Sequence, residues 1–152
     1  MAPSWLGPLI GFTLFSLVFA TLSWHRPLAG RLVGGLLLVS GGLFNSYLGT
    51  TDPSAYAAFK SLALLDLYRT VIDAVFPAYG TPFILAIALG QLMSGALLLI
   101  GGRWLRFGAL GGLLFSLGIV PLGIGSAFPA PLLMAMAYGL LLRHAGRQAS
   151  EI

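Results

Sequence analysis

Long apolar runs alternate with short polar or proline-containing segments along the chain. Each run approaches the roughly 20 residues that an α-helix needs to cross a hydrocarbon core about 30 Å thick. The runs cover residues 6–24, 28–49, 81–102, 107–122 and 129–142. The last two count separately because a single helix over both would be too long for one span, and Pro121 and Pro129 interrupt it. The pattern predicts an all-α membrane protein with five transmembrane helices, forming a single domain over residues 1–152.

The segment between the second and third runs has a different pattern. Apolar side chains fall on one half of a helical wheel, and Asp66, Arg69 and Asp73 fall on the other half. Three charges near the centre make this segment unsuited to crossing a bilayer. We therefore expect an amphipathic helix over about residues 53–76, ended by Pro77, that lies in the membrane interface.

Charge is scarce and unevenly distributed. Hydrophobic residues make up 58% of the chain and charged residues 8%, whereas soluble domains carry roughly 25% charged residues, so the lipid bilayer is the expected partner. With five spans, one side of the membrane receives six of the eight basic residues, namely Arg26, Arg31, Arg103, Arg106, Arg143 and Arg147. The positive-inside rule then predicts a cell-membrane protein with its N-terminus outside and its C-terminus in the cytoplasm. No basic residue precedes the first run, which favours a retained helix over a cleaved signal peptide.

Several kinds of chemistry have no support in the sequence. The basic residues form no patch with interleaved aromatic residues, which argues against nucleic acid as a partner. The chain has no cysteine, and His25 and His144 stand beside arginines at the ends of apolar runs, so no metal site is predicted. No motif of a metalloprotease, a P-loop, a nucleophile elbow or a dinucleotide site occurs. These observations predict no catalytic residue and favour a protein without enzymatic activity.

Six polar residues are candidates for a binding site: Asn45, Asp66, Tyr68, Arg69, Asp73 and Gln91. The three charged ones could form a polar lid in which Arg69 binds an anionic or carbonyl oxygen, or they could form a solvated ion-pair face. Gln91 lies near the middle of the third run, where it would either join helices by a hydrogen bond or line a ligand cavity. Asn45 is either a helix-end residue or part of a pocket mouth shared with Tyr68.

The sequence resembles the DoxX-like family of small bacterial membrane proteins over roughly residues 28–143. The resemblance is carried by GRLVGGLLLVSGGLF (residues 30–44), DPSAYAAF (52–59), GQLMSGALLLIGG (90–102) and WLRFGALGGLLF (104–115). It implies a four-span bundle to which the first span is an addition, a bacterial inner-membrane location, and a link to respiratory or redox complexes. Members of the family often have a glutamate at the position of Gln91. Because glutamine cannot ionise, this chain lacks an ionisable group at that point of the third run.

Two functions have support in the sequence, and a small transporter or channel is left open as a third, although one midplane amide offers few groups to replace the hydration of an ion. The resemblance and the small-residue surface of the second run favour a non-catalytic accessory protein or subunit of a membrane complex, associating with a membrane partner or with copies of itself. The alternative is a membrane-embedded binding protein or enzyme for a quinone-like or lipid-like molecule, with a pocket near Asn45, Tyr68, Arg69 and Gln91. The residues assign no cofactor, and only the family link would admit a quinone.

Overall fold

The computed structural model describes residues 6–149, and this part of the chain is helical without any strand. The two ends of the predicted domain, residues 1–5 and 150–152, lie outside the described residues. The α-helices are α1 (Leu6–His25), α2 (Pro27–Thr51), α3 (Asp66–Ile100), α4 (Leu105–Ile119) and α5 (Ala130–Ala149). The 3-10 segments are η1 (Pro53–Leu62), η2 (Gly102–Trp104) and η3 (Val120–Ser126). The predicted all-α class is confirmed.

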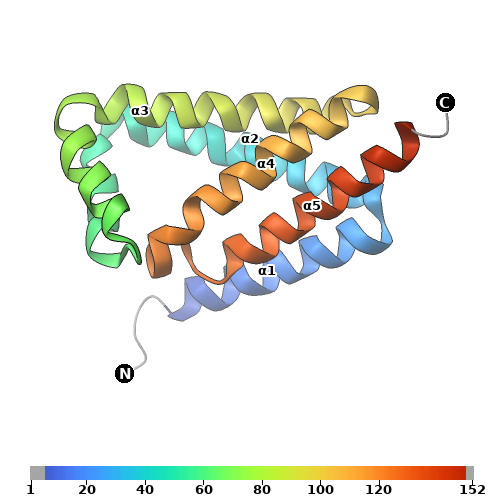
Figure 1. The fold of residues 1–152 in the computed structure, drawn as a ribbon, viewed down its shortest axis with the longest axis horizontal. Helices are drawn as coiled ribbons and strands as arrows, with labels where there is room; N and C mark the ends of the chain where they lie inside the picture. Colours follow the sequence, from blue (N-terminus) through green and yellow to red (C-terminus); the bar gives the residue numbers. More distant parts are fainter. Residues whose placement is uncertain (1–5, 150–152) are drawn as a thin grey trace.

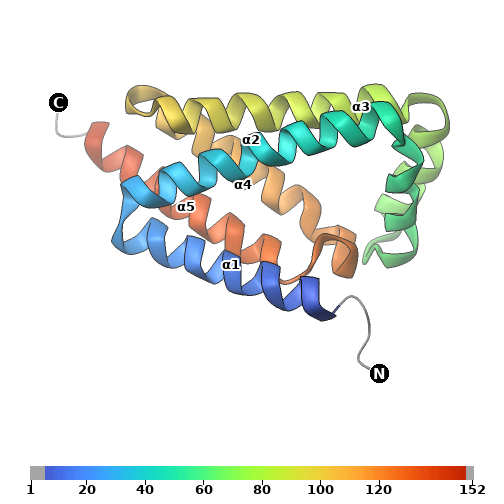
Figure 2. The same ribbon diagram turned by 180° about the vertical axis from the view of Figure 1, so that it is seen from behind.

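The five α-helices run up and down along one long axis (Figure 1). Helices α2 and α3 lie side by side along one edge of the bundle, α1 and α5 lie side by side along the other, and α4 crosses between the two pairs (Figures 1 and 2). Segment η1 and the first turns of α3 fold across one end. This end cap and the space beneath it position the candidate site.

Within residues 6–149, four segments are long and apolar enough to cross a membrane: α1, α2, α3 and the stretch Gly102–Gly123 that contains α4. Large apolar side chains are exposed on the outer surface of these helices, as expected for a bundle surrounded by hydrocarbon. The predicted run 129–142 is part of α5, but this helix continues past Arg143 to Ala149. Its last turns are too polar for it to count with the other four, so the fifth span stays a prediction.

The predicted helix over residues 53–76 is wrong as a single element. Segment η1 ends at Leu62, the backbone is extended at Ala63 and Leu65, and α3 begins at Asp66. Tertiary contacts hold this break: the Leu64 N–H donates to the Pro121 carbonyl at 2.8 Å. Because the Leu64 N–H has its hydrogen-bond partner in another segment, a break in the helix leaves no N–H unsatisfied at this residue.

Pro77 does not end the helix as predicted. Helix α3 continues to Ile100, and the chain changes direction at Tyr79, whose φ of −131° and ψ of 18° are not helical. Pro77 and Pro82 have no N–H to donate, and a kink accommodates the missing hydrogen bonds. Figure 1 shows the chain turning at this point, so that the first turns of α3 cap the bundle and the rest runs along α2.

Glycines bring the helices close together. A Cβ atom placed on Gly35 of α2 would lie 3.2 Å from the Gly95 carbonyl, and one placed on Gly95 of α3 would lie 2.8 Å from the Gly35 carbonyl. Gly30 and Gly34, which belong to the small-residue surface of the second run, face Ser23 and the ring of Phe19 on α1. The small residues of the second run therefore pack inside this bundle, as small residues commonly do in lipid.

Charges gather at opposite ends of the bundle. The end with the η2 turn contains Arg26, Arg31, Arg103, Arg106 and Arg143, because α1 and α5 finish there and α2 and α4 begin there. The capped end contains Lys60, Arg69 and the aspartates 52, 66 and 73. The sorting of charge that was predicted from the order of the runs is thus present in the fold.

Candidate functional site

Two adjoining cavities lie between the helices near the capped end. Their volumes are about 320 Å³ and 420 Å³. They share a set of lining residues, namely Asn45, Phe59, Phe115, Ile119 and Ser126. Both linings are mainly aromatic and aliphatic, and no charged side chain of the described residues lines either cavity. Cavities of this size and character are typical of sites for small apolar molecules.

A chain of hydrogen bonds runs along the junction of the cavities. The Tyr56 hydroxyl donates to Asn45 Oδ1 at 2.5 Å, and Asn45 Nδ2 donates to Gln91 Oε1 at 2.6 Å. These bonds connect η1, α2 and α3, so they tie the end cap to the main helix pair. Burial raises the pKa of Tyr56 above its usual value.

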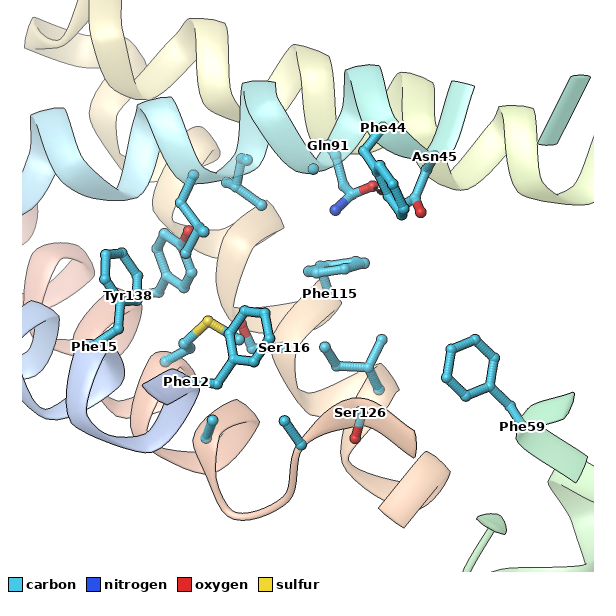
Figure 3. A pocket seen from close by; sticks show the side chains of 17 residues that line it. Phe12, Phe15, Phe44, Asn45, Phe59, Gln91, Phe115, Ser116, Ser126 and Tyr138 are labelled. Atoms are coloured by element: carbon cyan, nitrogen blue, oxygen red, sulfur yellow. Dashed lines mark hydrogen bonds between the residues drawn. The ribbon is translucent and has the colours of Figure 1, made fainter. Parts of the chain in front are cut away.

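The amide nitrogen of Gln91 is directed into the first cavity. Figure 3 shows the Gln91 oxygen turned toward Asn45 and the nitrogen turned into the space between the lining residues. Within residues 6–149 this nitrogen makes no hydrogen bond, although Gln91 as a whole is 4% exposed. An amide nitrogen that faces an apolar cavity without a hydrogen-bond partner is unfavourable, and a ligand oxygen would satisfy it.

Two serines add polar groups to the same cavity. Ser116 of α4 is fully buried, and its Oγ has no hydrogen-bond partner among the described residues. The Ser126 hydroxyl donates to the Gly123 carbonyl at 2.9 Å, which leaves its oxygen available as an acceptor. Figure 3 shows Ser116 beside Phe12, and Ser126 on the side of the cavity toward Phe59. The cavity thus combines an apolar body with a few neutral polar groups.

The structure brings three of the six predicted site residues to the cavities. Asn45 lines both, Gln91 lines the first, and Tyr68 lines the second. The Tyr68 hydroxyl donates to the Gly118 carbonyl at 2.6 Å, which joins the start of α3 to the end of α4. The sequence left two roles open for Gln91, and the residue has both: it links helices by a hydrogen bond, and it lines a cavity.

The three charged candidates lie elsewhere. Arg69 pairs with Asp66 at 2.9 Å and also donates to the Ala63 carbonyl at 2.8 Å, while Asp73 pairs with Lys60 at 2.7 Å. The side chain of Asp66 is 91% exposed and that of Asp73 is 58% exposed. None of the three lines a cavity. Their contacts fasten η1 and the extended break to the start of α3, and exposed pairs of this kind contribute little stability.

Sequence reasoning missed several residues of the site. Tyr56, Phe59, Phe115 and Ser116 were not among the candidates, because aromatic and small residues in apolar helices are usually packing residues. Tyr56 and Phe59 are spaced so that both rings lie on one side of η1, with ring centroids 5.9 Å apart. That spacing was the available signal, and it was hidden in a segment expected to form a longer α-helix.

Within the described residues, no group of three or more His, Asp or Glu side chains is arranged to hold a metal ion. Comparison with known proteins found no matching family model, no matching curated protein and no matching solved structure. The chain is thus defined by its own features, as an all-helical protein with four segments able to cross a membrane and two adjoining apolar cavities. The DoxX-like resemblance stays a prediction.

Proposed function

We propose that this chain is an integral membrane protein that binds an uncharged lipid-like or quinone-like molecule in the two adjoining cavities. The observation that carries the proposal is the unpartnered Gln91 amide nitrogen inside an apolar, aromatic-lined cavity of about 320 Å³. Specific sites for small apolar molecules commonly pair a large hydrophobic lining with a small number of placed polar groups.

The lining residues indicate how such a molecule would reach the site. Phe12 of α1 and Phe44 of α2 line the first cavity and are also exposed on the outside of the bundle, by 54% and 61%. In a bilayer these outer faces meet hydrocarbon. A lipid-soluble molecule could therefore pass from the bilayer between α1 and α2 without crossing water.

The same linings favour binding over catalysis. The polar groups available are amides, hydroxyls and backbone groups, and no carboxylate, histidine or lysine of the described residues lines either cavity. General acid–base and nucleophilic mechanisms normally need such groups at the reacting atoms. We therefore propose a binding protein rather than an enzyme, with a quinone as one of the molecules that would fit.

The alternative function is an accessory subunit of a membrane complex, which draws on the family resemblance and on the glycine-rich helix faces. Gly30, Gly34, Gly35 and Gly95 contact neighbouring helices of the same chain, so these faces are not available to a partner. The subunit hypothesis would regain support if a second protein co-purified with the chain in fixed proportion.

Binding can be tested by native mass spectrometry of the protein extracted in mild detergent. Gly118 lines the second cavity, and a Cβ atom there would have no neighbour within 4 Å, so Gly118→Leu adds a large side chain at the cavity wall without a clash. We expect the wild type to carry a bound lipid-like molecule and Gly118→Leu to lose it at least several-fold.

Two control variants sharpen this experiment. Gly90→Leu also enters open space, but Gly90 lines neither cavity, so its bound molecule should remain. Arg69→Ala should also keep the molecule, because Arg69 contacts Asp66 and Ala63 rather than a cavity. Loss of the molecule from Arg69→Ala would restore the charged lid as the site, and a bare wild-type protein would refute the proposed function.

We further propose that α5 completes a fifth span and that the basic end of the bundle faces the cytoplasm of a bacterial cell. The support is that α5 lies beside α1 and finishes at the same end of the bundle, where five arginines gather. The chain has no cysteine, so single cysteines can report the side of each end. In intact spheroplasts, we expect an impermeant maleimide to label Phe128→Cys, and to label Arg143→Cys only after permeabilisation. Labelling of both from one side would show that α5 does not cross.

A further inference from the structure

We propose that the Gln91 amide nitrogen recognises a carbonyl oxygen on the bound molecule, and that Tyr56 positions this amide through Asn45. This inference rests on the proposed function and names the chemical class of its ligand: an uncharged molecule with an apolar body and a carbonyl oxygen. It also assigns a role to Tyr56, which lies 35 residues before Gln91 in the chain.

The direction of the hydrogen-bond chain follows from the chemistry of its first member. The Tyr56 hydroxyl donates to Asn45 Oδ1, so the Asn45 nitrogen must face Gln91. That nitrogen is a donor, so Gln91 must turn its oxygen toward Asn45 and its nitrogen into the cavity. One tyrosine hydroxyl thus determines that the cavity contains a donor rather than an acceptor.

The reverse arrangement is less favourable for a physical reason. If both amides were turned around, Asn45 would donate to the Tyr56 oxygen, and the tyrosine hydrogen would need another acceptor. The Asn45 oxygen is the only hydrogen-bond acceptor that Tyr56 has among residues 6–149. Leaving this part-buried hydroxyl without an acceptor in the protein is unfavourable, so the observed direction is preferred.

The position of the nitrogen depends on a glycine. Gly41 of α2 faces the Gln91 amide, and a Cβ atom on Gly41 would lie 3.0 Å from Nε2. Gly41 also lines the first cavity. Glycine at this position therefore leaves room beside the nitrogen, through which a ligand oxygen can approach.

The rest of the lining restricts the class of ligand. No charged side chain of the described residues is present to neutralise an anion or a cation, and an unpaired ion in such surroundings is strongly disfavoured. An uncharged carbonyl oxygen accepts from the Gln91 nitrogen without that cost. This oxygen could belong to the acyl ester of a bilayer lipid or to a ring ketone of a quinone-like molecule.

Two matched pairs of probes test the inference. Diacylglycerol has ester carbonyls and dialkylglycerol replaces them with ether linkages, while decyl-benzoquinone has ring ketones and decylbenzene has none. Binding to the full chain in detergent would be measured by native mass spectrometry as a titration. For the wild type we expect the carbonyl member of at least one pair to bind about tenfold more tightly than its partner. The pair that shows this preference identifies the source of the carbonyl.

The variants assign the preference to particular groups. Gln91→Met should abolish the preference, and Tyr56→Phe should reduce it to about twofold while leaving the affinity for the carbonyl-free member unchanged. Tyr79→Phe is the matched control, because Tyr79 is exposed and lines neither cavity, and it should keep the full preference. If Tyr56 had only a structural role, Tyr56→Phe would lower the affinity for both members of a pair equally.

Gly41→Ala keeps the amide and places a methyl group beside its nitrogen, so it tests the inference even if Gln91→Met fails to fold. Its preference should fall as well. A preference that persists in Gly41→Ala and in Gln91→Met overturns the recognition by Gln91 but leaves the proposed function standing. If none of the four probes binds the wild type, the carbonyl recognition and the proposed function are both overturned. If the wild type binds the two members of each pair equally, only the carbonyl recognition is overturned.

Discussion

Replacing Tyr138 with alanine is expected to lower the free energy of unfolding by about 3 kcal/mol or more. Tyr138 of α5 is 1% exposed and lies at the centre of the core. Its ring meets the ring of Phe19 edge-on, with centroids 5.0 Å apart and an interplanar angle of 74°. Its hydroxyl donates to the Gly34 carbonyl at 3.0 Å. A single side chain therefore joins three helices.

The size of this effect follows from how the ring is held. A Cβ atom on Gly34 of α2 would lie 2.9 Å from the Tyr138 ring, and one on Gly112 of α4 would lie 2.6 Å from it. Both helices thus approach the ring as closely as glycine permits. Removing the ring leaves a space that neither backbone can fill, so the packing contacts of the ring are lost.

Thermal unfolding in detergent, followed by tryptophan fluorescence, would measure this loss. Tyr138→Phe is the matched control, because it keeps the ring and removes only the bond to the Gly34 carbonyl, at a cost of about 1 kcal/mol. If both variants melted at the wild-type temperature, Tyr138 would not be central to the packing of these helices.

Gly95→Ala is expected to destabilise the protein by about 1–3 kcal/mol, because one methyl group would push α2 and α3 apart. The Cβ atom would lie 2.8 Å from the Gly35 carbonyl and 2.9 Å from the Val39 nitrogen. These are backbone atoms, which cannot move aside as the end of a flexible side chain can. Relief would require the two helices to separate along their shared face.

The same helix contains the matched control. Gly90 lies five residues before Gly95 in α3, and a Cβ atom there would meet nothing within 4 Å. Gly90→Ala should be neutral or stabilising by up to about 1 kcal/mol, since alanine is the better helix former. Equal melting temperatures for Gly95→Ala and Gly90→Ala would contradict the close contact between α2 and α3.

The first two predicted spans match α1 and α2 to within two residues, because the length and apolarity of a run depend on neighbouring residues only. The segment over residues 53–76 did not follow its local pattern. Its break at Ala63–Leu65 depends on the Pro121 carbonyl, which lies far along the chain. The passage of α3 through Pro77 likewise depends on the kink at Tyr79, which local propensity does not specify.

The candidate site was partly predictable. Asn45 and Gln91 stood out as polar residues in apolar runs, and in lipid such residues need partners. Their meeting at 2.6 Å could not be derived, since either residue could have paired with another helix. The charged residues Asp66, Arg69 and Asp73 were predicted as candidates because charge is rare in this chain. Exposure at the end of the bundle explains them without a role in binding.

The sequence by itself determined that this protein is built from apolar helices of membrane-crossing length and that its arginines gather at alternate connections. Both follow from composition along short stretches, because hydrocarbon selects apolar helices of a set length and excludes charge. Only the tertiary structure decided that Tyr56, Asn45 and Gln91 form one directed chain beside two cavities. That arrangement depends on how closely glycines let α2 and α3 approach and on where η1 folds back, and both are properties of packing between distant segments.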